Sequence, residues 1–234
     1  MLVLLPGIDG TDVLFEPLRH ALPHTLEVQA HAFPRGRGNS YRELLASLAP
    51  ALPADRPFVL LAWSFSGPLA VMLAAQSIPT LRGLILCSTF ARRPHPYLPK
   101  RAGVVARPAL MKLYPALSRV KARLGGYAGG GVEGLLQRSL AQATPEGVSE
   151  RLREVFRVDV RPLIPRIHLP TLYVRATRDR VVPAWCMGDF RRGMPHLRVA
   201  EIDGPHPALV TNPSSAAAVI GAFVDDVLSG SADQ

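Results

Sequence analysis

The chain has 234 residues, a formal net charge of +9 and 48% hydrophobic residues, which suits one domain with a sizeable core. No apolar run approaches the roughly 20 residues of a membrane-spanning helix, and the apolar start at Met1–Leu5 is too short for a signal peptide. Cys87 and Cys186 lack metal-ligand spacing and are typical of reduced thiols. We therefore expect a cytoplasmic protein without a membrane span or a bound metal.

Strand and helix patterns alternate along both ends of the chain. Strands are predicted at 2–5, 26–32, 58–63, 83–87, 171–176 and 197–202. Helices are predicted at 13–21, 40–51, 65–77, 183–192 and 213–228. This alternation predicts an α/β fold with a mainly parallel sheet and helices on both faces, built from residues 1–90 and 171–234.

Residues 91–170 interrupt the alternation. They carry helical patterns at 103–123, 132–142 and 145–157, broken by glycines at 125–126 and 129–131. We expect this segment to form a helical cap insertion over a functional site, with the glycines as a hinge or mobile edge. The alternative is a helical decoration with a flexible loop.

The stretch from Phe58 to Ala70, FVLLAWSFSGPLA, is an apolar strand that turns abruptly into a helix. Such a turn lifts the hydroxyl of Ser64 above the sheet edge, and it needs small neighbours, here Ala62 and Ser66. Gly67 then lets the helix pack close to the strand. The pattern predicts a nucleophilic serine at Ser64. Ser66 is the rival nucleophile, and a plain strand-to-helix connection is the alternative without chemistry.

Two further polar residues each follow a predicted strand. Asp179 comes after the strand at 171–176, and His206 comes after the strand at 197–202. The carboxyl ends of parallel strands share one edge, so these residues and Ser64 can meet there. The chemistry then predicts Ser64 as nucleophile, His206 as general base and Asp179 as the acid that orients it. Asp203, on the same loop as His206, is the rival acid.

The first strand breaks into a glycine-containing loop, Pro6-Gly-Ile-Asp-Gly10. Glycines leave backbone N–H groups free to bind a developing oxyanion, and we expect the two donors to be Ile8 and Phe65. Asp9 and Asp12 could instead be a metal pair. That alternative is weaker because no clustered histidine or further carboxylate accompanies them.

These segments together resemble the α/β-hydrolase superfamily of serine esterases over nearly the whole chain. The turn around Ser64, the Thr-Arg-Asp179 turn and the Gly-Pro-His206 loop match the family's nucleophile, acid and base segments. Leu5-Pro-Gly-Ile8 falls where the family usually has His-Gly-x. The resemblance therefore implies Ile8 as an oxyanion donor.

Three departures from the family pattern stand out. Pro6 replaces the usual histidine, and Ala62 and Ser66 replace the usual glycines. The chain also begins almost on the oxyanion strand, so we expect the two N-terminal strands common in the family to be absent or vestigial. None of these departures removes a catalytic group.

The short chain and Trp63 before the nucleophile resemble carboxylesterases that cleave methyl esters of acyl chains on acyl carrier protein. This resemblance implies a cofactor-free serine hydrolase that acts on carboxylic esters or thioesters through an acyl-enzyme. An acyltransferase or perhydrolase could use the same triad. A non-catalytic ligand-binding protein could also have the same fold.

Nine Lys or Arg and no Asp or Glu lie between Arg92 and Arg123. This basic stretch would attract an anionic substrate or an acidic acyl carrier protein, or it is simply a solvated helix face. Aromatic residues are not interleaved as stacking platforms, so we expect no nucleic-acid partner. Apolar side chains expected to contact a small acyl ester substrate are Trp63, Phe90, Tyr97, Leu110, Leu113 and Tyr114.

Overall fold

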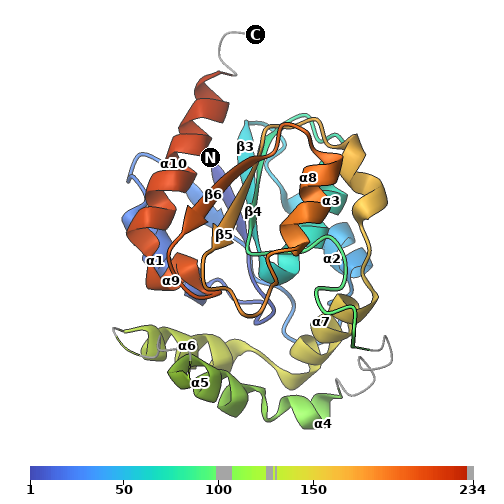
Figure 1. Ribbon diagram of the computed structural model, residues 1–234, viewed down its shortest axis with the longest axis vertical. Helices are drawn as coiled ribbons and strands as arrows, with labels where there is room; N and C mark the ends of the chain where they lie inside the picture. The colour runs from blue at the N-terminus through green and yellow to red at the C-terminus, as the bar shows by residue number, and fades with distance from the viewer. Residues whose placement is uncertain (99–106, 125–128, 130, 231–234) are drawn as a thin grey trace.

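A computed structural model describes residues 1–98, 107–124, 129 and 131–230 (Figure 1). The sheet in this part of the chain has six parallel strands in the order β2-β1-β3-β4-β5-β6. The strands are β1 Leu2–Leu5, β2 Val28–Ala30, β3 Phe58–Trp63, β4 Leu81–Cys87, β5 Thr171–Ala176 and β6 Arg198–Ile202. All six predicted strands are present, although β2 is shorter than expected and β4 starts two residues earlier.

Helices cover both faces of the sheet (Figure 1). One face carries α1 Glu16–Ala21, α9 Ala208–Thr211 and α10 Pro213–Ser229. The other face carries α2 Tyr41–Leu48, α3 Gly67–Ala74 and α8 Cys186–Gly193. Short 3₁₀ turns occur at η1 Val13–Phe15, η2 Ala49–Ala51, η3 Ser64–Ser66 and η5 Arg161–Arg166. The predicted fold class, a parallel α/β sheet with helices on both faces, is confirmed.

The core forms two apolar layers, one on each side of the sheet. In β1, Val3 and Leu5 contribute to one layer, whereas Leu2 and Leu4 contribute to the other. Side chains of a strand alternate between faces, and here both faces are covered, so the strand must be apolar throughout. This requirement explains the unbroken apolar runs of β1 and β3, and it fixes where each strand ends.

Four helices of the 91–170 segment, hereafter the insertion helices, form a separate layer beside the carboxyl ends of the strands (Figure 1). They are α4 Pro108–Met111, α5 Tyr114–Leu124, α6 Val132–Gln142 and α7 Pro145–Arg157. The single helix predicted at 103–123 is divided because Pro115 has no N–H to donate to the carbonyl of Met111. Residues 103–106 and the glycines at 125, 126 and 130 lie outside the described residues.

Polar contacts join the insertion to the sheet domain, among them a backbone bridge and two carboxylates of α7. A short antiparallel bridge pairs Arg92 with Asp159, where the segment leaves and rejoins the core. On α7, Glu150 accepts from the N–H of Asn39 (3.0 Å) and Glu154 accepts from the N–H of Tyr41 (3.1 Å). These carboxylates stabilise the N-terminus of α2, where the helix dipole favours negative charge. Among the described residues, no helix is long and apolar enough to cross a membrane.

Candidate active site

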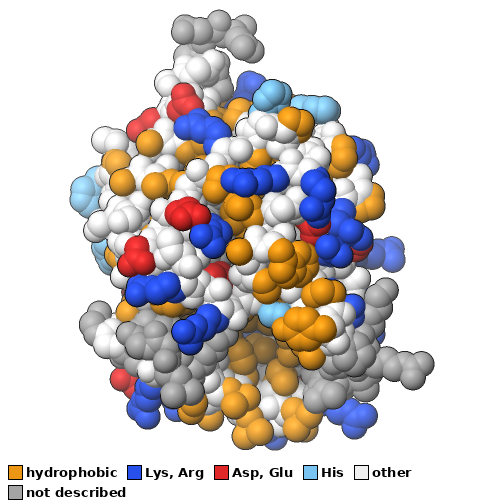
Figure 2. All heavy atoms as spheres, in the orientation of Figure 1, with side chains coloured by type: hydrophobic (Ala, Val, Ile, Leu, Met, Phe, Trp, Pro, Cys, Tyr) orange, Lys and Arg blue, Asp and Glu red, His pale blue; other side chains and the backbone are white. Residues whose placement is uncertain are grey.

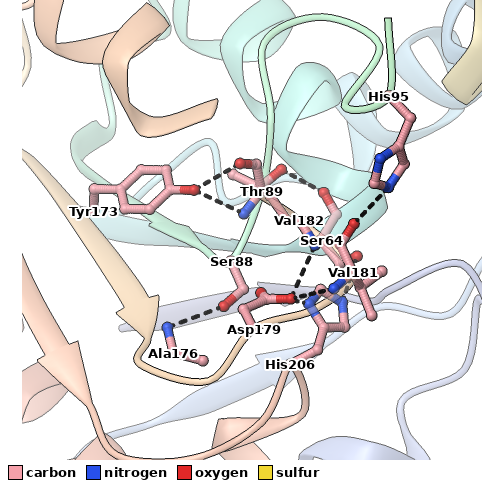
Figure 3. Close-up of polar contacts among 10 residues, drawn as sticks. All are labelled: Ser64, Ser88, Thr89, His95, Tyr173, Ala176, Asp179, Val181, Val182 and His206. Atoms are coloured by element: carbon pink, nitrogen blue, oxygen red, sulfur yellow. Dashed lines mark hydrogen bonds and ion pairs between the residues drawn. The ribbon is translucent and has the colours of Figure 1, made fainter. Parts of the chain in front are cut away.

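The turn after β3 holds Ser64 in an unusual backbone conformation. Its φ of 54° lies in the left-handed region, which costs a non-glycine residue about 1–3 kcal/mol. The hydroxyl of Thr89 donates to the carbonyl of Ser64 and helps to hold this conformation (Figure 3). Gly67 packs directly against Thr89, and any side chain at position 67 would overlap it. The glycine is therefore required by the close approach of α3 to the end of β4.

The two serines of the turn have different surroundings. The hydroxyl of Ser66 is fully buried and donates to the carbonyl of Pro6, which ties the turn to the loop after β1. The hydroxyl of Ser64 instead faces His206, and Ser64 lines a cavity. The structure thus brings Ser64 to the histidine and gives Ser66 a structural contact.

Ser64, His206 and Asp179 form a continuous chain of polar contacts (Figure 3). The Nε2 atom of His206 lies 3.0 Å from Ser64 Oγ, and its Nδ1 atom lies 2.7 Å from Asp179 Oδ2. The ring of His206 also stacks against that of Trp63, with 6.0 Å between centroids. Three residues that are far apart in sequence therefore meet at the carboxyl edge of the sheet, because each lies in the turn or loop after a strand.

Asp179 is held as an ionised carboxylate. Burial alone would raise its pKa, but the hydrogen bond and charge of His206 and the N–H groups of Val182 and Val181 outweigh burial, so the pKa lies below its ordinary value. The two amides donate to Oδ1 at 2.9 and 2.8 Å, leaving Oδ2 for the imidazole. An acceptor at Nδ1 places the proton there and leaves the Nε2 lone pair facing Ser64.

The rival acid, Asp203, lies on the outside of the same loop. Its carboxylate accepts from Thr177 Oγ1 (2.9 Å) and from Arg178 (3.2 Å), and its side chain is 73% exposed. These contacts join two neighbouring turns. The carboxylate within hydrogen-bond distance of His206 is that of Asp179.

Ile8 and Phe65 both line the cavity beside Ser64. Neither of their backbone N–H groups donates a hydrogen bond to another described residue. Their carbonyls, by contrast, are both engaged. Tyr41 donates to the carbonyl of Phe65 (2.8 Å) and stacks on its ring, and Arg151 Nε donates to the carbonyl of Ile8 (2.7 Å). These bonds hold the peptide units that follow Ile8 and Phe65. The units that carry the two N–H groups are held by the carbonyl of Gly7, which accepts from the N–H of Gly10 (3.0 Å), and by the carbonyl of Ser64, which accepts from Thr89.

Arg151, on α7, supports the loop after β1 and was not anticipated from the sequence. It is only 1% exposed, and its guanidinium donates to the carbonyls of Ile8 and Asp9 and to Asn39 Oδ1. Gly10, with φ of 72°, leaves room for the guanidinium. Burial lowers the pKa of Arg151 to about 10, so it stays charged at neutral pH. The sequence feature that could have indicated this role is an arginine on the apolar face of a predicted helix, three residues after Val148.

Asp9 belongs to a hydroxyl cluster between the loop after β1 and α6. Its Oδ2 accepts from the N–H of Thr11 (3.1 Å), the hydroxyl of Thr11 (2.6 Å) and the hydroxyl of Ser139 (2.9 Å). Asp12 takes no part in these contacts. In the described part of the chain, no group of three or more His, Cys, Asp or Glu is arranged to hold a metal ion.

A cavity of about 390 Å³ lies between the strand ends and the insertion helices, and its wall is mainly apolar. Of the predicted contact residues, Trp63, Phe90 and Tyr114 line it. Tyr97, Leu110 and Leu113 do not, and they are 76, 44 and 57% exposed. The spacing of apolar residues indicated an amphipathic segment but not which side of it would face the cavity. Figure 2 shows apolar side chains on the outer surface at this end of the molecule.

Similarities to known proteins bear on the fold and on the kind of reaction. No family model matches the chain. It is 28% identical to a pimeloyl-[acyl-carrier protein] methyl ester esterase of Neisseria meningitidis serogroup A, over 96% of this chain and 77% of the relative. It is 27% identical to an esterase of the same name from Xanthomonas axonopodis pv. citri, over 87% of this chain and 86% of the relative.

Solved structures agree at the level of the fold. The enol-lactonase of Burkholderia xenovorans superposes with a TM-score of 0.78 at 20% identity, covering 95% of this chain and 90% of that one. An esterase of Thermogutta terrifontis gives a TM-score of 0.79 at 20% identity, covering 97% and 90%. The chain has the α/β-hydrolase fold. The predicted resemblance to α/β-hydrolase esterases is confirmed, and the shared name of the curated relatives supports the prediction of an ester hydrolase.

Proposed function

We propose that this α/β-hydrolase cleaves carboxylic esters or thioesters through an acyl-enzyme on Ser64. His206 Nε2 takes the proton from Ser64 Oγ as that oxygen attacks the ester carbonyl carbon. The N–H groups of Ile8 and Phe65 then bind the oxyanion of the tetrahedral intermediate. The intermediate collapses, the bond to the leaving alcohol or thiol breaks, and His206 returns the proton to it.

Water completes the cycle in the same site. His206 removes a proton from water as the water oxygen attacks the acyl carbon, and the second intermediate releases the acid and restores Ser64. Asp179 fixes the tautomer of His206 and stabilises the imidazolium in both halves. No step requires a cofactor. The observation that carries the proposal is the contact chain Ser64–His206–Asp179, with distances of 3.0 and 2.7 Å.

We further propose that the acyl ester is presented by an acidic acyl carrier protein. Two considerations support this: the relatives named above act on an ester of an acyl carrier protein, and exposed cations lie on the insertion helices beside the cavity. Arg107, Lys112 and Arg119 are all exposed there. On this proposal the insertion helices act as a cap that shapes substrate access. The predicted cytoplasmic location, where such carriers are found, fits two buried free cysteines.

The nucleophile is tested by comparing Ser64→Ala with Ser66→Ala. We expect Ser64→Ala to lower the hydrolysis of a short p-nitrophenyl ester by at least about 10³-fold and to abolish labelling by a fluorophosphonate probe. Ser66→Ala should keep both the labelling and most of the activity. Its expected cost is stability, about 1–3 kcal/mol, because the carbonyl of Pro6 loses its buried donor. Full activity in Ser64→Ala would overturn the proposal.

A further inference from the structure

We propose that His95, near the start of the 91–170 insertion, is a positioning residue of the active site. It holds the peptide unit that donates to Asp179, and through Asp179 it orients His206. This inference rests on the proposed function, because it takes Ser64, His206 and Asp179 as the reacting set. It adds a fourth side chain that supports the set and that comes from the insertion.

His95 lines the same cavity as Ser64 and reaches the loop that follows β5 (Figure 3). Its Nε2 atom lies 3.0 Å from the carbonyl oxygen of Val181. A carbonyl oxygen can only accept, so Nε2 carries a proton and donates it. The Nδ1 atom lies 2.7 Å from the hydroxyl of Tyr97, which donates to it when the ring is neutral. Both ring nitrogens are therefore engaged, and these contacts fix the tautomer.

The carbonyl of Val181 and the N–H of Val182 belong to one peptide unit. They point in opposite directions because the peptide bond is trans. The oxygen of this unit accepts from His95, and its N–H donates to Asp179 Oδ1 at 2.9 Å. A peptide unit that accepts at its oxygen is polarised and donates more strongly at its N–H. His95 therefore orients this N–H and strengthens its bond to the carboxylate.

The hydrogen bonds continue from this peptide unit to the nucleophile. Asp179 Oδ1 also accepts from the N–H of Val181 at 2.8 Å, which leaves Oδ2 for His206 Nδ1 at 2.7 Å. His206 Nε2 in turn lies 3.0 Å from Ser64 Oγ. Without the donor of His95, one of the two N–H groups that fix the Asp179 carboxylate is held less firmly. The imidazole of His206 then loses part of its orientation, and a small misplacement of a general base lowers the rate.

The alternative is a purely structural role, in which the ring of His95 only attaches the insertion to the loop after β5. The two roles predict different orders among three substitutions. His95→Gln keeps an amide N–H near the position of Nε2, His95→Asn places it near the position of Nδ1, and His95→Phe keeps a ring without a donor. Positioning through the carbonyl of Val181 requires the donor, so His95→Gln should retain the most activity. Attachment by the ring requires its shape, so His95→Phe should retain the most.

Two rates measured on the full chain test the proposal: the turnover of a short p-nitrophenyl ester and the labelling of Ser64 by a fluorophosphonate probe. We expect His95→Phe and His95→Asn to lower kcat and the labelling rate by about 5- to 20-fold with little change in KM, and His95→Gln by less than about 3-fold. His168→Phe is the matched control, since His168 is exposed before β5 at the opposite end of the strands, and it should change neither rate. If His95→Phe does not fold, the comparison of His95→Gln with His95→Asn carries the test.

A double-mutant cycle with Asp179→Ala, followed by the labelling rate, separates positioning from general damage. Asp179→Ala removes the carboxylate through which His95 acts, so adding His95→Phe should lower the rate by less than about 2-fold further. Independent losses in this cycle, or a His95→Phe protein at least as fast as His95→Gln, overturn the positioning role. If the parent protein cleaves no ester but Ser64 is labelled in the expected order, the positioning role stands and the proposed hydrolysis is rejected. A parent protein whose Ser64 is not labelled would overturn both.

Discussion

The carboxyl edge of the sheet and the insertion helices line opposite sides of one cavity, but they position their polar groups by different means. At the sheet edge, Ser64, Asp179 and His206 each lie in the turn or loop after a strand, so the hydrogen-bonded ladders set where these loops begin. The insertion contributes Arg93 and Arg151, whose charges are carried on long side chains. Their positions depend on what surrounds them. The sheet edge thus carries the proposed reacting groups, whereas the insertion supplies the opposite wall of the cavity.

The two arginines of the insertion also differ from each other. Arg151 is 1% exposed and donates to three protein oxygen atoms. Arg93 is only partly buried, yet its NH1 atom is enclosed and has no acceptor among the described residues. An arginine with every contact made within the protein fixes a loop.

The largest expected effect comes from the sheet edge. Asp179→Asn removes the acceptor that sets the tautomer of His206, and we expect kcat/KM for a short p-nitrophenyl ester to fall by about 10⁴-fold. Asp203→Asn is the matched control, since it changes the rival carboxylate on the neighbouring turn, and it should keep most of the activity. Equal losses in the two variants would contradict the assignment of Asp179.

Asp179 should also affect stability in a pH-dependent way. Its pKa in the folded protein lies below the ordinary value of 3.8, so its ionised form stabilises the fold. This contribution is complete above the unfolded pKa and is lost as pH falls through the lower folded pKa. Urea unfolding between pH 3 and 7 should therefore show the gap between the parent protein and Asp179→Asn shrinking below about pH 4. A gap that widens toward acid would contradict this sign.

A smaller loss is expected when the insertion no longer supports the loop after β1. Arg151→Met leaves the carbonyls of Ile8 and Asp9 and the amide oxygen of Asn39 without their donor. We expect the free energy of unfolding to fall by about 3 kcal/mol. We also expect kcat to fall by about 10- to 100-fold, because the N–H of Ile8 shifts.

Arg157→Met serves as the control for this change, since Arg157 is exposed at the end of the same helix α7. Arg157→Met should change neither the free energy of unfolding nor kcat by much. If Arg151→Met lowers stability but keeps kcat, Arg151 supports the fold and not the oxyanion site, and the contrast between sheet edge and insertion becomes sharper.

The smallest effect is expected on the outer surface of the insertion. Reversing the charges of Lys112 and Arg119 to glutamate should slow the cleavage of a carrier-bound ester several-fold at low salt, with the difference fading near 0.5 M salt. The rate on the matching free ester should change far less. Reversal of Arg82 and Arg166, exposed beyond the opposite end of the strands, is the control. Equal effects of both pairs would show that the basic stretch is only a solvated surface.

The sequence predicted the fold because its signals were local. Apolar runs, turn residues and the small neighbours of Ser64 fix strands and their ends within a few residues. The parallel sheet then brings the residues after β3, β5 and β6 to one edge without further information. For this reason Ser64, Asp179 and His206 could be predicted together from the sequence, with Ser66 and Asp203 as rivals.

The remaining features depended on tertiary packing. The spacing of apolar residues did not indicate that Tyr114 would face the cavity while Leu110 and Leu113 faced solvent. An amphipathic pattern shows that a helix has an apolar side but not which surface that side packs against. The basic stretch likewise did not reveal that Arg93 would line the cavity. The sequence by itself thus determined the strands and the order of the proposed reacting groups. Only the tertiary structure decided which residues line the cavity and which contacts each arginine makes. The reason is that the positions of long side chains and the orientations of helices are fixed by contacts distant in sequence.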